Sequence, residues 1–372
     1  MHGFHIIDLR KRKPLAVLYA ASTLRAFAFS FINIFLPLFL LKSGYSIENI
    51  LIFYFIQFAA AGVASIMAAK SLEESGIRLT VGTSSAFLIV FYLLLFYIDI
   101  HSIPIYVLAI FAGFGEAFYI VPINVYFSIT ADKKHEGEEV GLLFEIPFIA
   151  TILGPIIGGA IVHLIGFDAL FFFASLIMLT SIIPLFWAKE IQRKHKFKMP
   201  EKVSVNETLG ILSAGARDTG VFVFWPLFLF LLVKQFVAVG IVESFSIFSA
   251  AVVTLLIGKL SDNYGEKKVL EWGSIANAVS WPLRVMFTTL SQLIFVALYI
   301  GVSALSLLVP MQSIIYKNAR KNPIQYFIFE QFMRAFGRVF MLILVLVFAA
   351  NLYIGLLFCS IAALGCSLYT KK

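Results

Sequence analysis

The stretch GKLSDNYGEKK, from Gly258 to Lys268, is a short polar segment between two long apolar segments. It carries the pattern Gly-x-Leu-x-Asp-x-x-Gly-x-Lys. Asp262 and Gly265 favour a tight turn, because an aspartate can hydrogen-bond to nearby backbone and a glycine tolerates a positive φ. A degraded copy, KSLEESGIR, lies nearly half a chain earlier, from Lys70 to Arg78. The two stretches together predict a chain built from two similar halves.

Other landmarks repeat with the same spacing. FLPLFLL, from Phe35 to Leu41, reappears as FWPLFLF, from Phe224 to Phe230, after a shift of 189 residues. A leucine and a glycine of the polar turn recur after 188 and 189 residues. One shared offset of about half the chain length indicates a parallel duplication.

The composition is that of a membrane protein. Of 372 residues, 60% are hydrophobic and 13% are charged, whereas soluble domains are about 45–50% apolar and about 25% charged. A membrane span needs about 20 apolar residues, so the chain has room for twelve. We expect the spans at residues 15–41, 47–69, 79–98, 104–129, 140–164, 168–188, 207–233, 236–257, 269–289, 292–316, 325–349 and 351–369.

The basic residues predict the topology. Of the 29 lysines and arginines, 22 lie before the first span, in every second loop or after the last span, and the opposite loops hold only Lys42 and Lys234. This bias places both termini in the cytosol and explains the net charge of +8 without a nucleic-acid partner. We expect residues 1–188 and 207–372 to form two six-helix bundles joined by a cytosolic linker, 189–206, in a prokaryotic plasma membrane.

The polar turn and its copy resemble the cytosolic signature loop of the major facilitator superfamily of secondary transporters. The resemblance covers essentially the whole chain. It implies an all-α membrane protein with twelve transmembrane helices in two pseudo-symmetric six-helix bundles, mostly monomeric, that works by alternating access around a midplane site. The loop positions that it implies as cytosolic gates are Glu74, Gly76, Arg78, Gly258, Asp262, Gly265 and Lys267.

The symmetry of that family places Asp262 beside the amino-terminal end of span 5, and Glu74 beside that of span 11. An anion is favoured there by the helix dipole, so we expect both residues to help hold the cytosolic side closed. Asp262→Asn should therefore change both the transport rate and the labelling of cysteines placed on the two sides of the cavity. An Asp262→Asn protein that is unchanged in both measurements would contradict this hypothesis.

Ten charged residues lie well inside the predicted spans, although each costs roughly 2.5–3.5 kcal/mol on insertion scales. Such residues usually face the interior of the bundle, whereas Arg284 is expected to lie toward the outer face and reach the headgroups. Spans 3, 6 and 12 contain none of the ten. They are Arg25, Glu116, Glu145, Arg217, Asp218, Glu243, Arg284, Glu330, Arg334 and Arg338.

Arg25 and Arg217 occupy similar depths in the related spans 1 and 7. They are candidates for a pair of cavity cations that bind an anionic group, and the alternative is that each pairs with a carboxylate of its own half. Arg217 and Asp218 are adjacent, so they should point about 100° apart and not face one another. Asp218 is a candidate proton carrier.

Glu116, in the segment GFGEAF, is a candidate coupling or substrate carboxylate, neutralised by a proton or by Arg25. The alternative is a static salt bridge. Glu330, Arg334 and Arg338 are spaced four residues apart on one helical stripe. A pair between Glu330 and Arg334 would leave Arg338 as a ligand for a carboxylate or phosphate, or the three residues form a cytosolic gate without substrate contact.

Span 5 contains ATILGPIIGG, Ala150 to Gly159. It resembles the antiporter signature of the superfamily, Gly-x-x-x-Gly-Pro-x-x-Gly-Gly, with Ala150 in place of the first glycine. The resemblance implies an exporter that exchanges its substrate for protons. Close helix packing explains the glycines equally well. The positions concerned are Gly154, Pro155, Gly158 and Gly159.

The chain lacks the motifs of a membrane enzyme or an ATP-driven pump. It contains no GxxxxGK[ST], HExxH or GxSxG, and its six histidines show no metal spacing. We therefore expect no catalytic activity, cofactor or metal, and transport driven by an ion gradient. The expected function is proton-coupled export of a small organic or drug-like compound, with lipids as the other partners. The alternatives are proton-linked uptake of a small anionic solute through Arg25, Arg217 and Arg338, and a sensor or scaffold without transport.

Overall fold

The computed structural model describes residues 13–96, 98, 104–130, 149–187 and 203–370. The predicted Glu145, the beginning of span 5 and most of the predicted linker lie outside these residues. Within them the regular structure is helical and contains no strand. The α-helices are α1 (Lys13–Ile32), α2 (Leu36–Lys42), α3 (Ile47–Phe96), α4 (Ile105–Thr130), α6 (Gly154–Leu164), α7 (Phe167–Thr180), α8 (Val205–Thr219), α9 (Trp225–Val233), α10 (Phe236–Tyr264), α11 (Glu266–Met286), α12 (Leu290–Ala319), α13 (Pro323–Val347) and α14 (Leu352–Gly365).

Short helices of other types extend three of these elements. They are the 3-10 helices η1 (Ile183–Trp187) and η3 (Cys366–Thr370), and the π-helix η2 (Gly220–Phe224), which joins α8 to α9.

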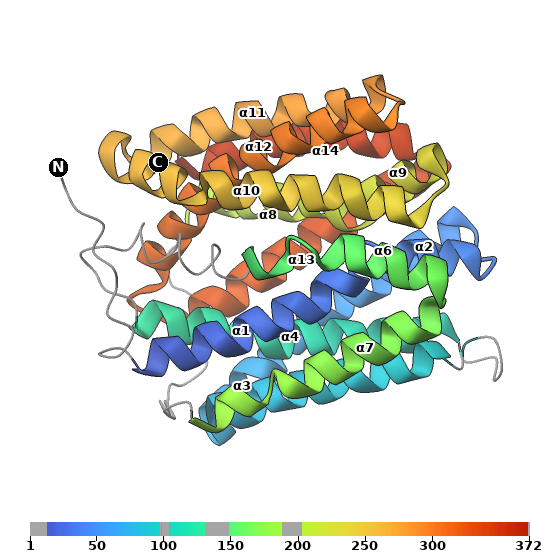
Figure 1. Cartoon of the computed structure of the whole chain (residues 1–372). Helices are drawn as coiled ribbons and strands as arrows, with labels where there is room; N and C mark the ends of the chain where they lie inside the picture. Colours follow the sequence, from blue (N-terminus) through green and yellow to red (C-terminus); the bar gives the residue numbers. More distant parts are fainter. Residues whose placement is uncertain (1–12, 97, 99–103, 131–148, 188–202, 371–372) are drawn as a thin grey trace.

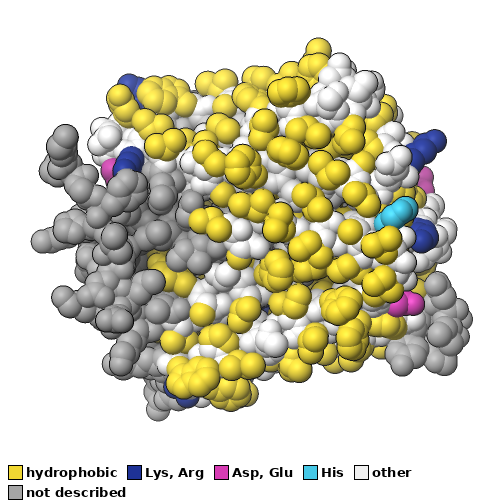
Figure 2. Space-filling model, in the orientation of Figure 1, with side chains coloured by type: hydrophobic (Ala, Val, Ile, Leu, Met, Phe, Trp, Pro, Cys, Tyr) yellow, Lys and Arg dark blue, Asp and Glu magenta, His cyan; other side chains and the backbone are white. Residues whose placement is uncertain are grey.

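Eight helical segments in the described part of the chain are long and apolar enough to cross a membrane. One of them is α3, whose 50 residues contain two predicted spans. The remaining three predicted spans correspond to α6, which is short as described, and to α11 and α13, whose apolar sequences are interrupted by polar or charged residues. Figure 2 shows hydrophobic side chains over the middle of the visible face and charged ones toward its two ends. The all-α, multi-pass membrane fold predicted from the sequence is confirmed.

Each polar turn contains fewer non-helical residues than the sequence predicts. Gly76 (φ 80°) and Gly265 (φ 87°) lie where helices meet, and α11 begins directly after Gly265. The chain reverses direction at Gly76. The evidence is the distance of 2.9 Å between Ser71 Oγ and Thr80 Oγ1, since residues nine positions apart in a straight helix are separated by about 13 Å. The other residues from Gly258 to Lys268 are helical. The turn itself falls on the glycine, which adopts a positive φ without strain.

The helices lie in two groups (Figure 1). One group contains α1 to α4, α6 and α7, and the other contains α8 to α12 and α14, while α13 contacts both α3 and α8. In Figure 1, α1 begins at the same end of the helices at which the C-terminus is marked. A cavity between the two groups is lined by residues from both halves of the sequence.

The predicted small-residue segment of span 5 packs tightly on both sides. A Cβ on Gly158 would lie 2.9 Å from the carbonyl oxygen of Phe31 in α1, and one on Gly159 would lie 2.7 Å from that of Phe236 in α10. Gly154 packs against Ser30. Close helix packing, the alternative interpretation of these glycines, thus describes their contacts.

The groups also meet through aromatic rings at the end of the helices opposite the start of α1. The rings of Phe167 in α7 and Phe236 in α10 lie 5.4 Å apart in an edge-to-face arrangement. The Nζ atom of Lys42 lies 5.5 and 5.6 Å from these two ring centroids. This contact joins α2 and α7 to α10 by cation–π attraction.

Candidate functional site

A cavity of about 510 Å³ lies between the two groups of helices, and we call it the central cavity. Its lining residues come from α1, α4, α8 to α13 and η2. Seven of the ten charged residues predicted inside the membrane line it: Arg217, Asp218, Glu243, Arg284, Glu330, Arg334 and Arg338.

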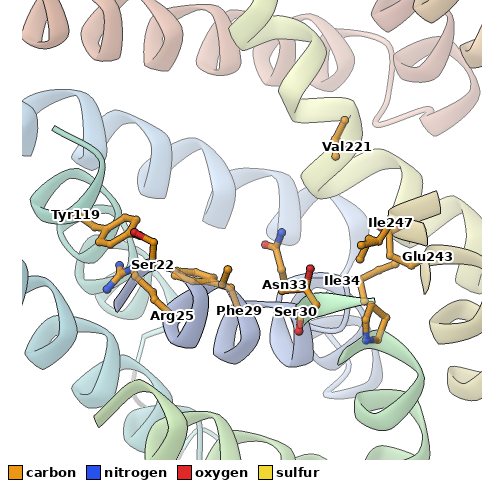
Figure 3. A pocket seen from close by; sticks show the side chains of 13 residues that line it. Ser22, Arg25, Phe29, Ser30, Asn33, Ile34, Tyr119, Val221, Glu243 and Ile247 are labelled. Carbon is orange, nitrogen blue, oxygen red and sulfur yellow. The ribbon is translucent and has the colours of Figure 1, made fainter. Parts of the chain in front are cut away.

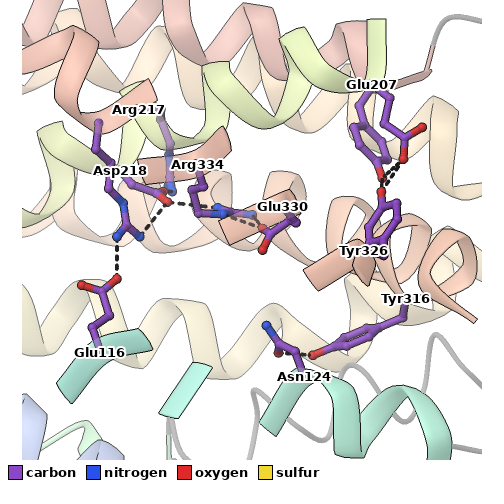
Figure 4. Close-up of polar contacts among 11 residues, drawn as sticks. Glu116, Asn124, Glu207, Arg217, Asp218, Tyr316, Tyr326, Glu330 and Arg334 are labelled. Atoms are coloured by element: carbon purple, nitrogen blue, oxygen red, sulfur yellow. Dashed lines mark hydrogen bonds and ion pairs between the residues drawn. The ribbon is translucent and has the colours of Figure 1, made fainter. Parts of the chain in front are cut away.

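Six charged side chains form one continuous network (Figure 4), and five of them, all except Glu116, line this cavity. Arg338 Nη1 lies 2.5 Å from Glu116 Oε1, and Arg338 Nη2 lies 3.6 Å from Asp218 Oδ2. Arg334 bridges Asp218 and Glu330, with N–O distances of 3.0 and 2.6 Å. Arg217 lies 3.1 Å from Asp218. The network therefore contains three arginines and three carboxylates, whose charges balance.

Two glycines bring the helices of the network together. A Cβ on Gly215 of α8 would lie 2.8 Å from the carbonyl carbon of Arg334 in α13. A Cβ on Gly337 of α13 would lie 3.1 Å from the backbone nitrogen of Ala216. Neither position has room for a larger residue, as we expect where two helices cross at small residues. This crossing places Arg217 and Asp218 beside Arg334 and Arg338.

The structure corrects the prediction that Arg217 and Asp218 do not face one another, since Arg217 Nη1 donates a hydrogen bond to Asp218 Oδ1 at 3.1 Å. The long arginine side chain turns toward its neighbour, while its Nε donates to Asn277 Oδ1 at 3.1 Å. Directions of Cα–Cβ bonds alone did not anticipate this. The chain continues from Asp218 into the π-helix η2, a geometry frequent at functional sites.

The pairing of the other members was predicted in part. The bond between Glu330 and Arg334 is present as the four-residue spacing predicts, with Nε donating to Oε1 at 2.7 Å. Arg338 was expected to be the less satisfied cation, which is wrong because it binds Glu116 and Asp218. Glu116 pairs with Arg338 instead of Arg25. The partners come from α4 and α13, and no local spacing relates them.

The predicted position of Arg284 at the outer face is wrong. Arg284 is 1% exposed and lines the central cavity. Its guanidinium carbon lies 3.8 Å from the ring centroid of Trp281 and 5.0 Å from that of Trp225. The two indole rings stabilise the buried cation, so it has no need to reach the headgroups.

Arg25 lies apart from the network. It is 2% exposed, and Nη2 donates to Ser84 Oγ at 2.9 Å and to the carbonyl oxygen of Gly115 at 3.2 Å. The guanidinium carbon lies 3.9 Å from the ring centroid of Tyr119 (Figure 3). Among the residues that the structure describes, no carboxylate lies within 4 Å of its nitrogens. Arg25 and Arg217 line different cavities, so the expected pair of cavity cations does not converge on one space.

Tyr119 lies on the walls of three cavities. It lines the central cavity, a cavity of about 340 Å³ that reaches from Arg25 to Glu243, and a third that extends among the amino-terminal helices. Figure 3 shows the second of these, with Arg25 of α1 at one side and Glu243 of α10 at the other. Glu243 has no ion-pair partner within the described ranges.

The predicted gate residues lie around the bend of α3 and the junction of α10 and α11, on the side where α1 begins. Glu74 forms an exposed pair with Lys70 at 3.8 Å, and Lys267 Nζ donates to the carbonyl oxygen of Thr370 at 3.0 Å. Gly258 lies inside α10, as does Asp262, while Arg78 follows the bend of α3 at Gly76. The beginning of span 5, where Asp262 was expected to act, lies outside the described residues, so its gate role stays a prediction.

Sequence reasoning missed several polar contacts of the cavity. Tyr316 of α12 donates to Asn124 Oδ1 of α4 at 2.8 Å and so joins the two halves (Figure 4). Neutral residues such as Asn124 and Asn277 carry no charge signal, but an asparagine inside an apolar span is itself unusual and would have marked them. In the part of the chain that the structure describes, no three His, Cys, Asp or Glu side chains are grouped so as to hold a metal ion.

Comparisons with known proteins agree with this architecture. The family model described as Major Facilitator Superfamily matches residues 18–239. The crystal structure of the human organic anion transporter MFSD10 (TETRAN) is similar in fold, with a TM-score of 0.69 and 11% sequence identity, over 97% of this chain and 99% of that chain. A comparison with curated protein sequences gave no significant match. The matched region exceeds half of the chain, and the chain therefore belongs to the Major Facilitator Superfamily of secondary transporters.

Proposed function

We propose that the protein is a proton-coupled transporter that moves a small organic anion together with a proton by alternating access. The observation that carries this proposal is the ion pair between Glu116 of α4 and Arg338 of α13, 2.5 Å long, on the wall of the cavities. It joins the two halves of the chain through a carboxylate that can accept a proton.

The charge balance of the network favours movement of a proton and an anion together. With three arginines and three carboxylates, protonation of one carboxylate leaves one positive charge without a partner. A buried unpaired charge is unfavourable, and a bound anion would neutralise it. Conversely, a bound anion favours the protonated network, since the coupling between two binding sites is reciprocal.

The location of the pair connects protonation with motion. For the halves to separate at this point, Arg338 has to leave Glu116, and a charge-assisted hydrogen bond is about twice as strong as a neutral one. Protonation of Glu116 weakens the contact and lowers the barrier to rocking of the two groups of helices. The proton is thus both a charge carrier and a release for the cross-bundle contact.

The character of the cavity supports an organic substrate. Its volume of about 510 Å³ lies within the range of about 300–1,000 Å³ that is usual for small-molecule sites. Apolar side chains, among them Ile123, Phe222 and Leu308, line it beside the charged network. The structural neighbour is named as an organic anion transporter, which supports the same class.

The test is transport by the purified protein in liposomes, with benzoate, 2-naphthoate and succinate as probes and an internal pH dye. We expect an outside-acid gradient to drive accumulation of at least one probe, with protons entering alongside, and a proton ionophore to abolish it. If none of the anions moves, or if none responds to the gradient, the proposal is wrong, and a sensor or scaffold gains support.

Antiport is the second candidate, and a specific feature favours it. Pro155 and Gly159 of the segment that resembles the antiporter signature lie in a tight contact between α6 and α10, where Gly240 packs on the carbonyl of Pro155 and Gly159 on that of Phe236. These contacts join the two groups of helices at the segment whose resemblance to the antiporter signature implies an exporter. In the same liposomes antiport predicts the opposite result, accumulation driven by an inside-acid gradient.

A further inference from the structure

The cavity among the amino-terminal helices has a volume of about 280 Å³. We call it the aromatic cavity, because seven aromatic side chains line it: Phe29, Tyr54, Phe58, Phe91, Tyr92, Tyr119 and Phe222. Its volume is close to the lower limit of ligand sites, about 300 Å³, so it suits a molecule of one or two rings. Aromatic walls favour a planar ring through stacked and edge-to-face contacts.

Arg25 lines this cavity and is incompletely satisfied. Its Nε atom is buried without a hydrogen-bond partner, and the acceptor of Nη1 is the sulfur of Met178, at 3.6 Å. A guanidinium has five N–H donors and binds a carboxylate through two of them at once. With no carboxylate of the described chain within 4 Å, this buried cation lacks a counter-anion.

A second unsatisfied group lines the same space. The Oε1 atom of Gln57 is buried and has no hydrogen-bond partner, and Gln57 is part of the cavity wall. Buried acceptors without donors are rare in folded proteins. A ligand that carries a hydroxyl or amino group in addition to its acid would supply the missing donor.

The aromatic cavity adjoins the Glu116–Arg338 ion pair. The guanidinium carbon of Arg338 lies 4.9 Å from the ring centroid of Phe58 and 5.4 Å from that of Phe222, and both rings line the cavity. Glu116 lines it too. A ligand in this space would therefore contact the residues that surround the cross-bundle pair.

From these observations we infer that the aromatic cavity is the binding site for a small aromatic acid with a polar ring substituent. Arg25 binds the carboxylate, the seven rings enclose the aromatic body, and Gln57 Oε1 accepts a hydrogen bond from the substituent. This inference rests on the proposed function and narrows its substrate from organic anions in general to hydroxylated or amino-substituted aromatic acids.

Equilibrium binding to the purified full-length protein in detergent tests the ligand class, with isothermal titration calorimetry as the measurement. The probes are 6-hydroxy-2-naphthoate, its neutral amide, 2-naphthoate and octanoate. We expect 6-hydroxy-2-naphthoate to bind at least about tenfold more tightly than the amide or octanoate, since each lacks one of two strong interactions. Equal binding of all four probes would overturn the inference.

Variants test the site. Arg25→Gln should weaken binding of the acid by about 10- to 100-fold, the effect of losing a charge-assisted hydrogen-bonded pair, and leave binding of the amide nearly unchanged. Arg25→Lys should recover part of the loss. Gln57→Leu should remove the preference for the hydroxylated acid over 2-naphthoate, and it provides a second reading if Arg25→Gln does not fold. Phe295→Ala, at a ring that is 74% exposed, is the matched control and should bind like the parent protein.

The binding and transport experiments separate the two claims. Binding that depends on Arg25 without proton-driven movement in liposomes would overturn the proposed function and keep the aromatic-acid site. Proton-driven transport with unaltered binding by both Arg25→Gln and Gln57→Leu would overturn the inference and keep the proposed function.

Discussion

Replacing Glu116 by glutamine should reduce proton-driven accumulation of the substrate to the level of protein-free liposomes. Glutamine keeps the shape of the side chain and can still accept a hydrogen bond from Arg338, but it neither binds nor releases a proton. The network would then carry one permanent positive charge, so the anion still binds. The pH gradient, however, no longer drives the transport cycle. We expect exchange of labelled for unlabelled substrate, measured without a gradient, to remain detectable.

Glu48→Gln is the matched control for this experiment. Glu48 lies in the first turn of α3 and is exposed, so its loss should leave accumulation unchanged. If Glu116→Gln accumulated substrate as fast as the parent protein, Glu116 would not be the coupling carboxylate, and Asp218 and Glu330 would be the next candidates in the network.

Replacing Arg338 by glutamine should lower the free energy of unfolding by about 3–5 kcal/mol, as is usual when one partner of a buried ion pair is removed. Arg338 is 4% exposed, and its loss leaves Glu116 without its ion-pair partner and weakens the support of Asp218. The measurement is equilibrium or thermal unfolding of the purified protein in detergent. The double variant Glu116→Gln/Arg338→Gln should recover most of the loss, because neither charge is then buried alone.

Lys70→Gln is the control, since Lys70 forms an exposed pair with Glu74 at 3.8 Å and its side chain is 73% exposed. Exposed pairs contribute less than about 1 kcal/mol, so unfolding should scarcely change. A double variant that is no more stable than Arg338→Gln alone would show that the two side chains do not act as a pair.

The fold could be predicted because its signals are local or repeated. Gly76 and Gly265 mark the turns with a positive φ, and a run of about 20 apolar residues predicts a span wherever it occurs. The extent of the turns was overestimated, since polar side chains were interpreted as loop. At the ends of membrane helices such side chains reach water without leaving the helix.

The candidate site could be predicted as a set of residues but not as a set of pairs. The four-residue spacing of Glu330 and Arg334 anticipated their bond. Glu116 and Arg338 are separated by 222 residues, and only the packing of α4 and α13 brings them together. Arg284 was misplaced for a similar reason, because one of the two indoles that shelter it, that of Trp225, belongs to α9, which is far from Arg284 in the sequence.

The single-residue joints at Gly76 and Gly265 have a mechanical consequence. Because helix continues to within a residue of each joint, the two helices joined there move as one rigid unit, with no flexible loop between them. With a hydrocarbon core about 30 Å thick, a tilt of about 10° around the midplane displaces such a joint by about 3 Å. A small rotation near the ion network is thus transmitted to the membrane surface. Strain introduced at either glycine would likewise be transmitted to the helices at the ion network.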